Sequence, residues 1–220
     1  GSQRTTTRNW RWIITERSHS RTTNDLGYRV ELQSGQLVSY SLRLHPCELA
    51  APAAPGIGWL GGVAHAGHSD LGDPSNLPAS RAEDIAAAED AVISRISFEE
   101  TEYCEAAYTI ARADGSTLNQ PEEPVMEGLS IHMEGTWQKA GAEPVAFLLQ
   151  STIPSEEYAG LPEIWSGGDG PDGTLRATRR LGRLFSGMDF EQETDARLAK
   201  RALLNLSENA VLEFWLETLD

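Results

Sequence analysis

The sequence predicts a mainly β fold: an antiparallel β-sandwich with long loops and one C-terminal helix. Short runs of alternating apolar and polar residues recur along the chain and are separated by turn-forming Gly, Pro and Asn. Helical spacing of apolar residues is clearest near the C-terminus. Because an all-β domain often reaches 220 residues, we expect a single domain over 1–220. Within it we assign the sandwich core to 9–153, a long loop to 48–85 and a C-terminal strand-helix-strand unit to 174–220.

The N-terminal part predicts three strands. Segment 10–16 contains a β-branched run and favours a strand, and the polar segment 18–27 ends in a turn signal at its glycine. Segments 28–32 and 36–44 both alternate, and the Ser-Gly pair between them predicts a hairpin turn. Pro46 is expected to end the second strand of that hairpin.

The middle of the chain is irregular and then returns to strands. Segment 48–85 is rich in Gly, Pro and Ala, which predicts a long loop. Segment 81–91 favours a short acidic helix with Ser80 as its N-cap. Segments 91–99 and 103–113 are expected to pair with each other as a second pair of strands.

A third strand pair is predicted between 128–137 and 145–153, with a turn at Gly141. The following segment, 154–173, is predicted to be a loop.

The C-terminal unit begins with a strand over 174–179. Thr194 is expected to cap a helix over 195–206, and 212–217 alternates as a final strand.

The charge balance excludes some classes of partner. The chain has 18 Lys and Arg against 33 Asp and Glu, a net charge of −15. Nucleic acids and anionic membranes need a basic surface, so neither is expected as a partner. The sequence also contains no apolar run of about 18 residues that would predict a membrane span.

The two cysteines, Cys47 and Cys104, are far apart and predict a disulfide. Two buried thiols, or a metal-binding or catalytic thiol, are the alternatives. A disulfide would place the protein in an oxidising compartment, so we expect a periplasmic or secreted location. The chain opens on Gly1-Ser2, typical of a trimmed N-terminus, so the absence of a signal peptide carries no information.

A loop with two histidines is the clearest candidate site. His65 and His68 lie on either side of Gly67, whose backbone freedom lets both imidazoles turn toward one point. Asp70 and Asp73 add carboxylates nearby, and a metal ion needs three or four such groups. The alternative is a solvent-exposed loop without metal.

His45 is expected to join these histidines, because it lies two residues before Cys47 and the disulfide would hold it rigidly. Three imidazoles suit Cu(II) or Zn(II). The alternative is that His45 is a surface residue at a strand end.

His132 is the other candidate to complete the set. Met133 and Met126 lie close to it in sequence, and thioethers with histidine would suit Cu(I). The alternative is that Met133 belongs to the core and Met126 fills a gap at the edge of a loop.

Calcium is a weaker alternative. Segment 168–173 and the trio Asp70, Asp73 and Asn76 carry oxygen ligands, but neither matches the helix-loop-helix spacing of a calcium site. Both fit ordinary turns.

No catalytic motif is present: the sequence lacks a nucleophile elbow, HExxH, a phosphate-binding loop and a dinucleotide fingerprint. Clustered glutamates at 99, 100 and 102 do not set the carboxylate separation of a glycosidase. We therefore expect no enzymatic activity, and a hydrolase is the weakest hypothesis.

The sequence thus predicts an extracytoplasmic protein that captures or delivers a metal ion, copper rather than zinc. Its partners would be the ion and another extracytoplasmic protein. Trp59, six residues before His65, is placed to shape the ligand pocket. The alternative is a metal-free secreted binding or adhesion module for a glycan or protein.

Overall fold

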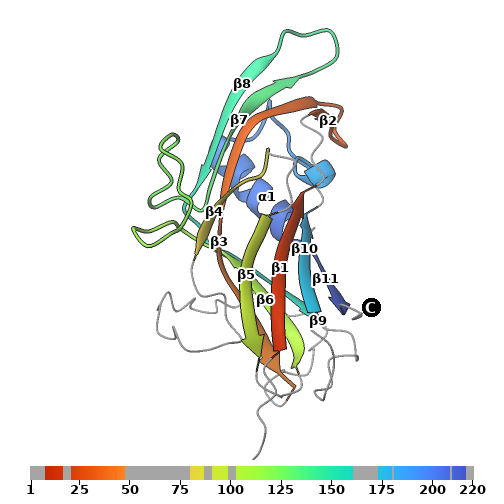
Figure 1. Cartoon of the computed structure of the whole chain (residues 1–220). Coiled ribbons are helices and arrows are strands. Elements are labelled where there is room, and N and C mark those ends of the chain that lie inside the picture. Colours follow the sequence, from red (N-terminus) through yellow and green to blue (C-terminus); the bar gives the residue numbers. More distant parts are fainter. Residues whose placement is uncertain are drawn as a thin grey trace, which may run out of the picture.

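The computed structural model describes residues 8–16, 21–47, 80–86, 91–98, 103–160, 173–179, 181–208 and 210–216. Its elements, shown in Figure 1, are β1 (Arg8–Glu16), β2 (Arg21–Thr23), β3 (Arg29–Pro46), β4 (Arg81–Asp84), β5 (Ala91–Phe98), β6 (Tyr103–Ile110), β7 (Ile131–Gln138), β8 (Val145–Ser151), β9 (Ser155–Gly160), β10 (Gly173–Arg179), the 3-10 helix η2 (Leu181–Arg183), α1 (Asp195–Glu208) and β11 (Ala210–Leu216). The predicted mainly β class and C-terminal helix are therefore confirmed.

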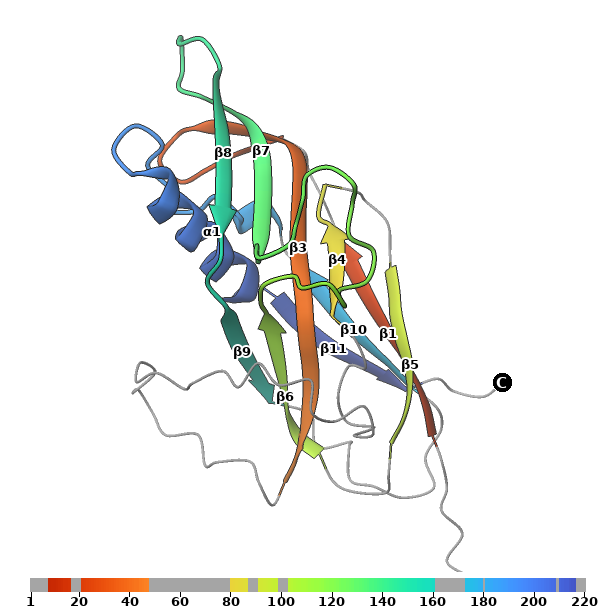
Figure 2. The same cartoon turned by 90° about the vertical axis from the view of Figure 1, so that its left-hand side faces the viewer.

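The strands form two sheets. The smaller has the order β11-β10-β1-β5, and the larger follows the path β8-β7-β3-β6-β9, with β2 and β4 also paired to β3. All the strand pairs described are antiparallel except β1 with β10, which is parallel. Figures 1 and 2 show the larger sheet curling along β3.

The 18-residue strand β3 is the spine of the larger sheet and corrects the predicted hairpin over 28–32 and 36–44. Its first half pairs with β7 and its second half with β6. Gly35 lies within the strand, where a Cβ would sit 2.6 Å from Cγ1 of Ile85. The glycine therefore marks a close approach of a neighbouring chain and does not form a turn. The real turn precedes β3 at Gly27 (φ 84°), and Pro46 ends the strand as predicted.

The prediction of an acidic helix over 81–91 is wrong for its first residues, which form the strand β4. Residues Arg81 to Asp84 pair with Ser39 to Gln36 of β3, and the Ile85 N–H donates to the Gly35 carbonyl. Ser80 caps no helix; its hydroxyl lies 2.8 Å from that of Thr117. Pairing with β3 and burial of Ile85 outweigh the helix propensity of these residues.

The strand segments 91–99 and 103–113 exist, but their predicted pairing is wrong. β5 pairs with β1 in the smaller sheet, whereas β6 pairs with β3 and β9 in the larger one. The predicted loop 154–173 likewise begins with β9, which lies along β6. These pairings join segments distant in sequence, so local patterns carry little information about them.

The remaining predicted elements are confirmed. β7 and β8 form the expected antiparallel pair, with Gly141 at φ 81° in the turn between them. The strands β1, β10 and β11 are present, and α1 begins after Thr194, whose carbonyl accepts the N–H of Leu198.

The main hydrophobic core lies between the larger sheet and the segment 181–206. It includes inward-facing residues of β3, β6, β7 and β8 together with α1: Leu32, Leu37, Leu42, Ala106, Ile110, Ile131, Met133, Phe147, Leu149, Leu198, Ala202, Leu203 and Leu206. The ring of Phe147 lies against Gly135, where a Cβ would come within 2.7 Å of its Cζ. A smaller cluster on the opposite face contains Val38, Ala113 and Met126. Figure 2 shows α1 running behind β8 and the 111–130 segment in front of β3.

A polar cluster attaches the start of β3 to the segment before α1. The buried Tyr28 hydroxyl donates to Asp189 Oδ1 at 2.7 Å, and Lys139 Nζ lies 2.7 Å from Glu191 Oε2. The hydrogen bond from Tyr28 lowers the pKa of Asp189.

No helix of the described residues is long and apolar enough to cross a membrane.

Candidate metal centre

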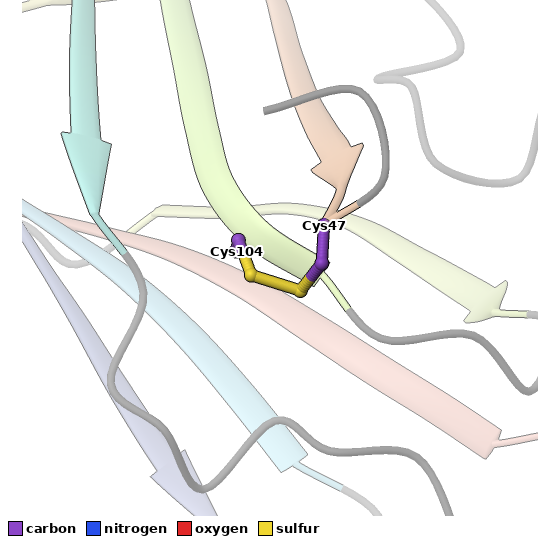
Figure 3. Close-up of a disulfide and its surroundings, with 2 residues drawn as sticks. All are labelled: Cys47 and Cys104. Atoms are coloured by element: carbon purple, nitrogen blue, oxygen red, sulfur yellow. A yellow bond between two sulfur atoms is a disulfide. The ribbon is translucent and has the colours of Figure 1, made fainter. Parts of the chain in front are cut away.

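The predicted disulfide between Cys47 and Cys104 is confirmed. The two Cα atoms are 4.7 Å apart, and Figure 3 shows the bridge joining the end of β3 to the start of β6. The bridge therefore covalently fixes the strand end from which the candidate histidine loop departs.

His45 lies on β3 two residues before this bridge. Its Cα partner on β6 is Glu105, and its ring centroid is 6.1 Å from that of Tyr158 on β9. The partly buried imidazole forms no hydrogen bond with the described part of the chain. Its nitrogens are therefore available to a ligand.

Tyr158 gives His45 an acidic setting. The half-exposed phenol donates to Glu156 Oε2 at 2.9 Å. Burial, this hydrogen bond and the negative charges of Glu156 and Glu105 raise the pKa of Tyr158 to about 12, against an opposing effect of Arg43. The phenol is therefore neutral at physiological pH, and the surrounding carboxylates favour a cation beside His45.

His132 on β7 is in a different environment. Its side chain is 6% exposed, and both ring nitrogens have partners. Nε2 lies 2.9 Å from Glu134 Oε1, and Gln150 Nε2 lies 3.1 Å from Nδ1. A metal ion would have to displace one of these hydrogen bonds.

His45 and His132 cannot bind the same ion. The Cα partner of His132 on β3 is Gln36, and His45 follows nine residues later on that strand. At about 3.3 Å per residue the separation is roughly 30 Å. The two histidines are therefore alternatives as partners of the loop histidines.

The two methionines are buried on opposite faces of the sheet. Met133 is fully buried in the main core, and Met126, 1% exposed, is in the smaller cluster. The predicted alternative role of Met133 as a core residue is confirmed, and Met126 likewise packs against apolar neighbours. Met133 and His132 are adjacent on one strand and so point to opposite faces.

His65, His68, Asp70, Asp73, Asn76 and Trp59 lie outside the described residues, as does the acidic segment 168–172. Within the described ranges no group of three or more His, Cys, Asp and Glu side chains is placed to bind a metal ion.

Sequence reasoning missed Tyr158 and Glu105 as neighbours of His45. Tyr158 was assigned to a loop, and Glu105 to a strand with the wrong partner. The alternation of 155–160 is too short to predict β9, and only the register of β3, β6 and β9 brings the three residues together.

Comparison with protein families gives no match, and comparison with curated protein sequences gives none either. Among solved structures, the chain has a weak similarity to MbnP from Methylosinus trichosporium, with a TM-score of 0.36 and 8% sequence identity. The alignment covers 98% of this chain and 100% of that chain. A likeness this slight does not establish a shared fold.

Proposed function

We propose that this protein binds a transition-metal ion outside the cytoplasm and captures or delivers it, with copper preferred over zinc. The proposed ligands are His45, His65 and His68. The disulfide supports the compartment, because such bridges form and persist in oxidising environments.

The observation that carries the proposal is the state of His45. Its imidazole has no hydrogen-bonding partner in the described chain, its surroundings are acidic, and the Cys47–Cys104 bridge holds its strand end in place. A ligand already fixed by the scaffold loses little conformational entropy when an ion binds. His132, with both nitrogens engaged, is the weaker choice.

Chain length permits the loop histidines to meet His45. His65 follows Cys47 by 18 positions. An extended chain spans about 3.3 Å per residue, so this length far exceeds what a return to the same strand end needs. His65 and His68 lie in one short segment, so a loop that brings one of them to His45 brings the other close.

The ligand chemistry favours copper. Imidazole nitrogens suit both Cu(II) and Zn(II), and affinity for a given set of such ligands is higher for Cu(II). We assign the protein to metal carriage because the sequence lacks the motifs of a nucleophile or general base.

The test is metal analysis of protein purified without a histidine tag, followed by Cu(II) titration of variants. We expect stoichiometric copper in the wild type and its loss in His65→Ala/His68→Ala. His45→Ala should weaken binding by at least about 100-fold, since residues that merely orient metal ligands already contribute about 10- to 100-fold.

His19→Ala and His132→Ala are the matched controls, because each removes one imidazole outside the proposed set. Both should keep wild-type stoichiometry. Unchanged copper binding in the double variant would refute the proposal. Glycan or protein binding that survives chelation would then support the metal-free binding module.

A further inference from the structure

A shallow cleft opens on the face of the larger sheet that lies away from α1. It encloses about 360 Å³ and is lined by Gln33, Glu134, Gly135, Ala146, Phe147 and Leu148. A β-bulge forms it: the register passes from Leu32 opposite Gly135 to Ser34 opposite Glu134, which leaves Gln33 as an extra residue. Bulges of this kind redirect a side chain and commonly border functional sites.

The carboxylate of Glu134 is held in a fixed orientation within this cleft. Gln150 Nε2 donates to Nδ1 of His132, so the ring hydrogen is on Nε2 and is donated to Glu134 Oε1. Nothing in the described chain binds the second oxygen of Glu134, and its side chain is 52% exposed.

The other cleft residues complement a cation that carries an alkyl chain. Gln33 is exposed and its amide oxygen has no partner in the described ranges. Ala146 and Leu148, the latter 45% exposed, form an apolar wall, and no Lys or Arg lines the cleft. The net charge of −15 further attracts cations.

We propose that this cleft binds an alkylammonium group. The ammonium would donate to the second oxygen of Glu134 and to the amide oxygen of Gln33, and its methylene groups would pack against Leu148. The volume is at the lower end of the range for ligand pockets, about 300–1,000 Å³. His132 is a positioning residue in this site, because its ring contacts and orients the Glu134 carboxylate.

Two sources share this chemistry: a free amine and the lysine side chain of a peptide. β8, which carries Ala146 and Leu148, has no neighbour on its outer edge within the described sheet. An extended peptide could therefore pair with β8 while its lysine enters the cleft.

The test is an NMR titration of the full chain in the presence of a chelator, with n-butylammonium as the probe. We expect the amide resonances of Gly135 and Leu148 to shift with n-butylammonium and not with n-butanol, its neutral analogue. Glu134→Gln should weaken binding on the order of tenfold, the size of one charge-assisted hydrogen bond.

Glu143→Gln is the matched control, because it removes the same charge from an exposed residue in the turn between β7 and β8. It should leave the affinity unchanged. A lysine-containing pentapeptide that binds more tightly than n-butylammonium, with shifts along β8, identifies a peptide ligand; equal affinity identifies a free amine.

Either result supports the site. Equal losses in Glu134→Gln and Glu143→Gln, or equal shifts with n-butanol, would overturn it, because the attraction would then come from the net charge or from apolar contact alone.

Discussion

His45 and His132 show how neighbouring groups determine what an imidazole can do. Both lie on strands of the same sheet, and the same face of that sheet carries both. Glu134 and Gln150 occupy both nitrogens of His132 and make its ring a support for a carboxylate. His45 has an aromatic neighbour and nearby carboxylates but no hydrogen bond to the described chain. Of these two histidines, His45 is the one whose ring nitrogens are not engaged by a hydrogen bond within the described chain.

Glu157 provides a residue-scale prediction about pH. Burial and the charge of Glu208 raise its pKa above the ordinary value of 4.5. The folded state therefore disfavours the ionised carboxylate. The contribution of Glu157 to stability is complete below pH 4.5 and is lost as the pH rises through the raised pKa.

We expect Glu157→Gln to raise the melting temperature at pH 7 and to have little effect near pH 4. Glu208→Gln should give a smaller gain at pH 7, because it removes the repulsion but leaves the burial of Glu157 unchanged. Thermal unfolding from pH 4 to pH 7 measures both variants. An equal gain for Glu157→Gln at both ends of this range would contradict the explanation.

The residues around the two histidines could be predicted only in part, because some of their contacts depend on how distant strands pair. Proximity in sequence placed His45 beside Cys47, and the cysteine pair predicted the bridge that the structure contains. Glu134, two residues from His132 on one strand, could be placed on its face by alternation. Gln150 could be added only from the register of β7 with β8, which the sequence leaves open.

At the scale of elements, local patterns predicted most strands and the helix but not the contacts between distant segments. Gly35 is the clearest example. A glycine after Ser34 is an ordinary turn signal, but here the missing side chain makes room for Ile85 of a segment about fifty residues away. The strand β4 was missed for the same reason, because its pairing with β3 replaces a helix that its composition favours.

The helix α1 packs through one face, and two adjacent leucines test this. Leu203 is 1% exposed within the core, whereas Leu204 is 38% exposed. Leu203→Ala should lower the free energy of unfolding by about 2–5 kcal/mol, as large-to-small changes in a core do. Leu204→Ala removes the same atoms from the surface and should change it by less than about 1 kcal/mol. Urea unfolding measures both, and equal losses would show that α1 packs differently.

At the scale of the whole molecule, β3 connects two regions with different roles. Its first half carries the bulge at Gln33 and the proposed cleft, and its second half ends at His45 and the disulfide. The two proposed sites are therefore held on one strand but are far apart along it. A ligand at one site need not affect the other, so the two proposals can be tested independently.

The disulfide should contribute to global stability. The bridged cysteines are 57 residues apart, and closing a loop of this size in the unfolded chain is worth about 4 kcal/mol in the chain-entropy model. We expect Cys47→Ser/Cys104→Ser to lose an amount of this order in urea unfolding. Reduced copper affinity should accompany it, since the end of β3 is released. A double variant as stable as the wild type would contradict this account.

The bridge also has a consequence for the integrity of the chain. A peptide bond hydrolysed anywhere between Cys47 and Cys104 would leave two fragments that sulfur still joins. The fragments would migrate as one species until a reductant separated them. A protease cut in the segment with the loop histidines would therefore go undetected in non-reducing gel electrophoresis and would become visible only after reduction.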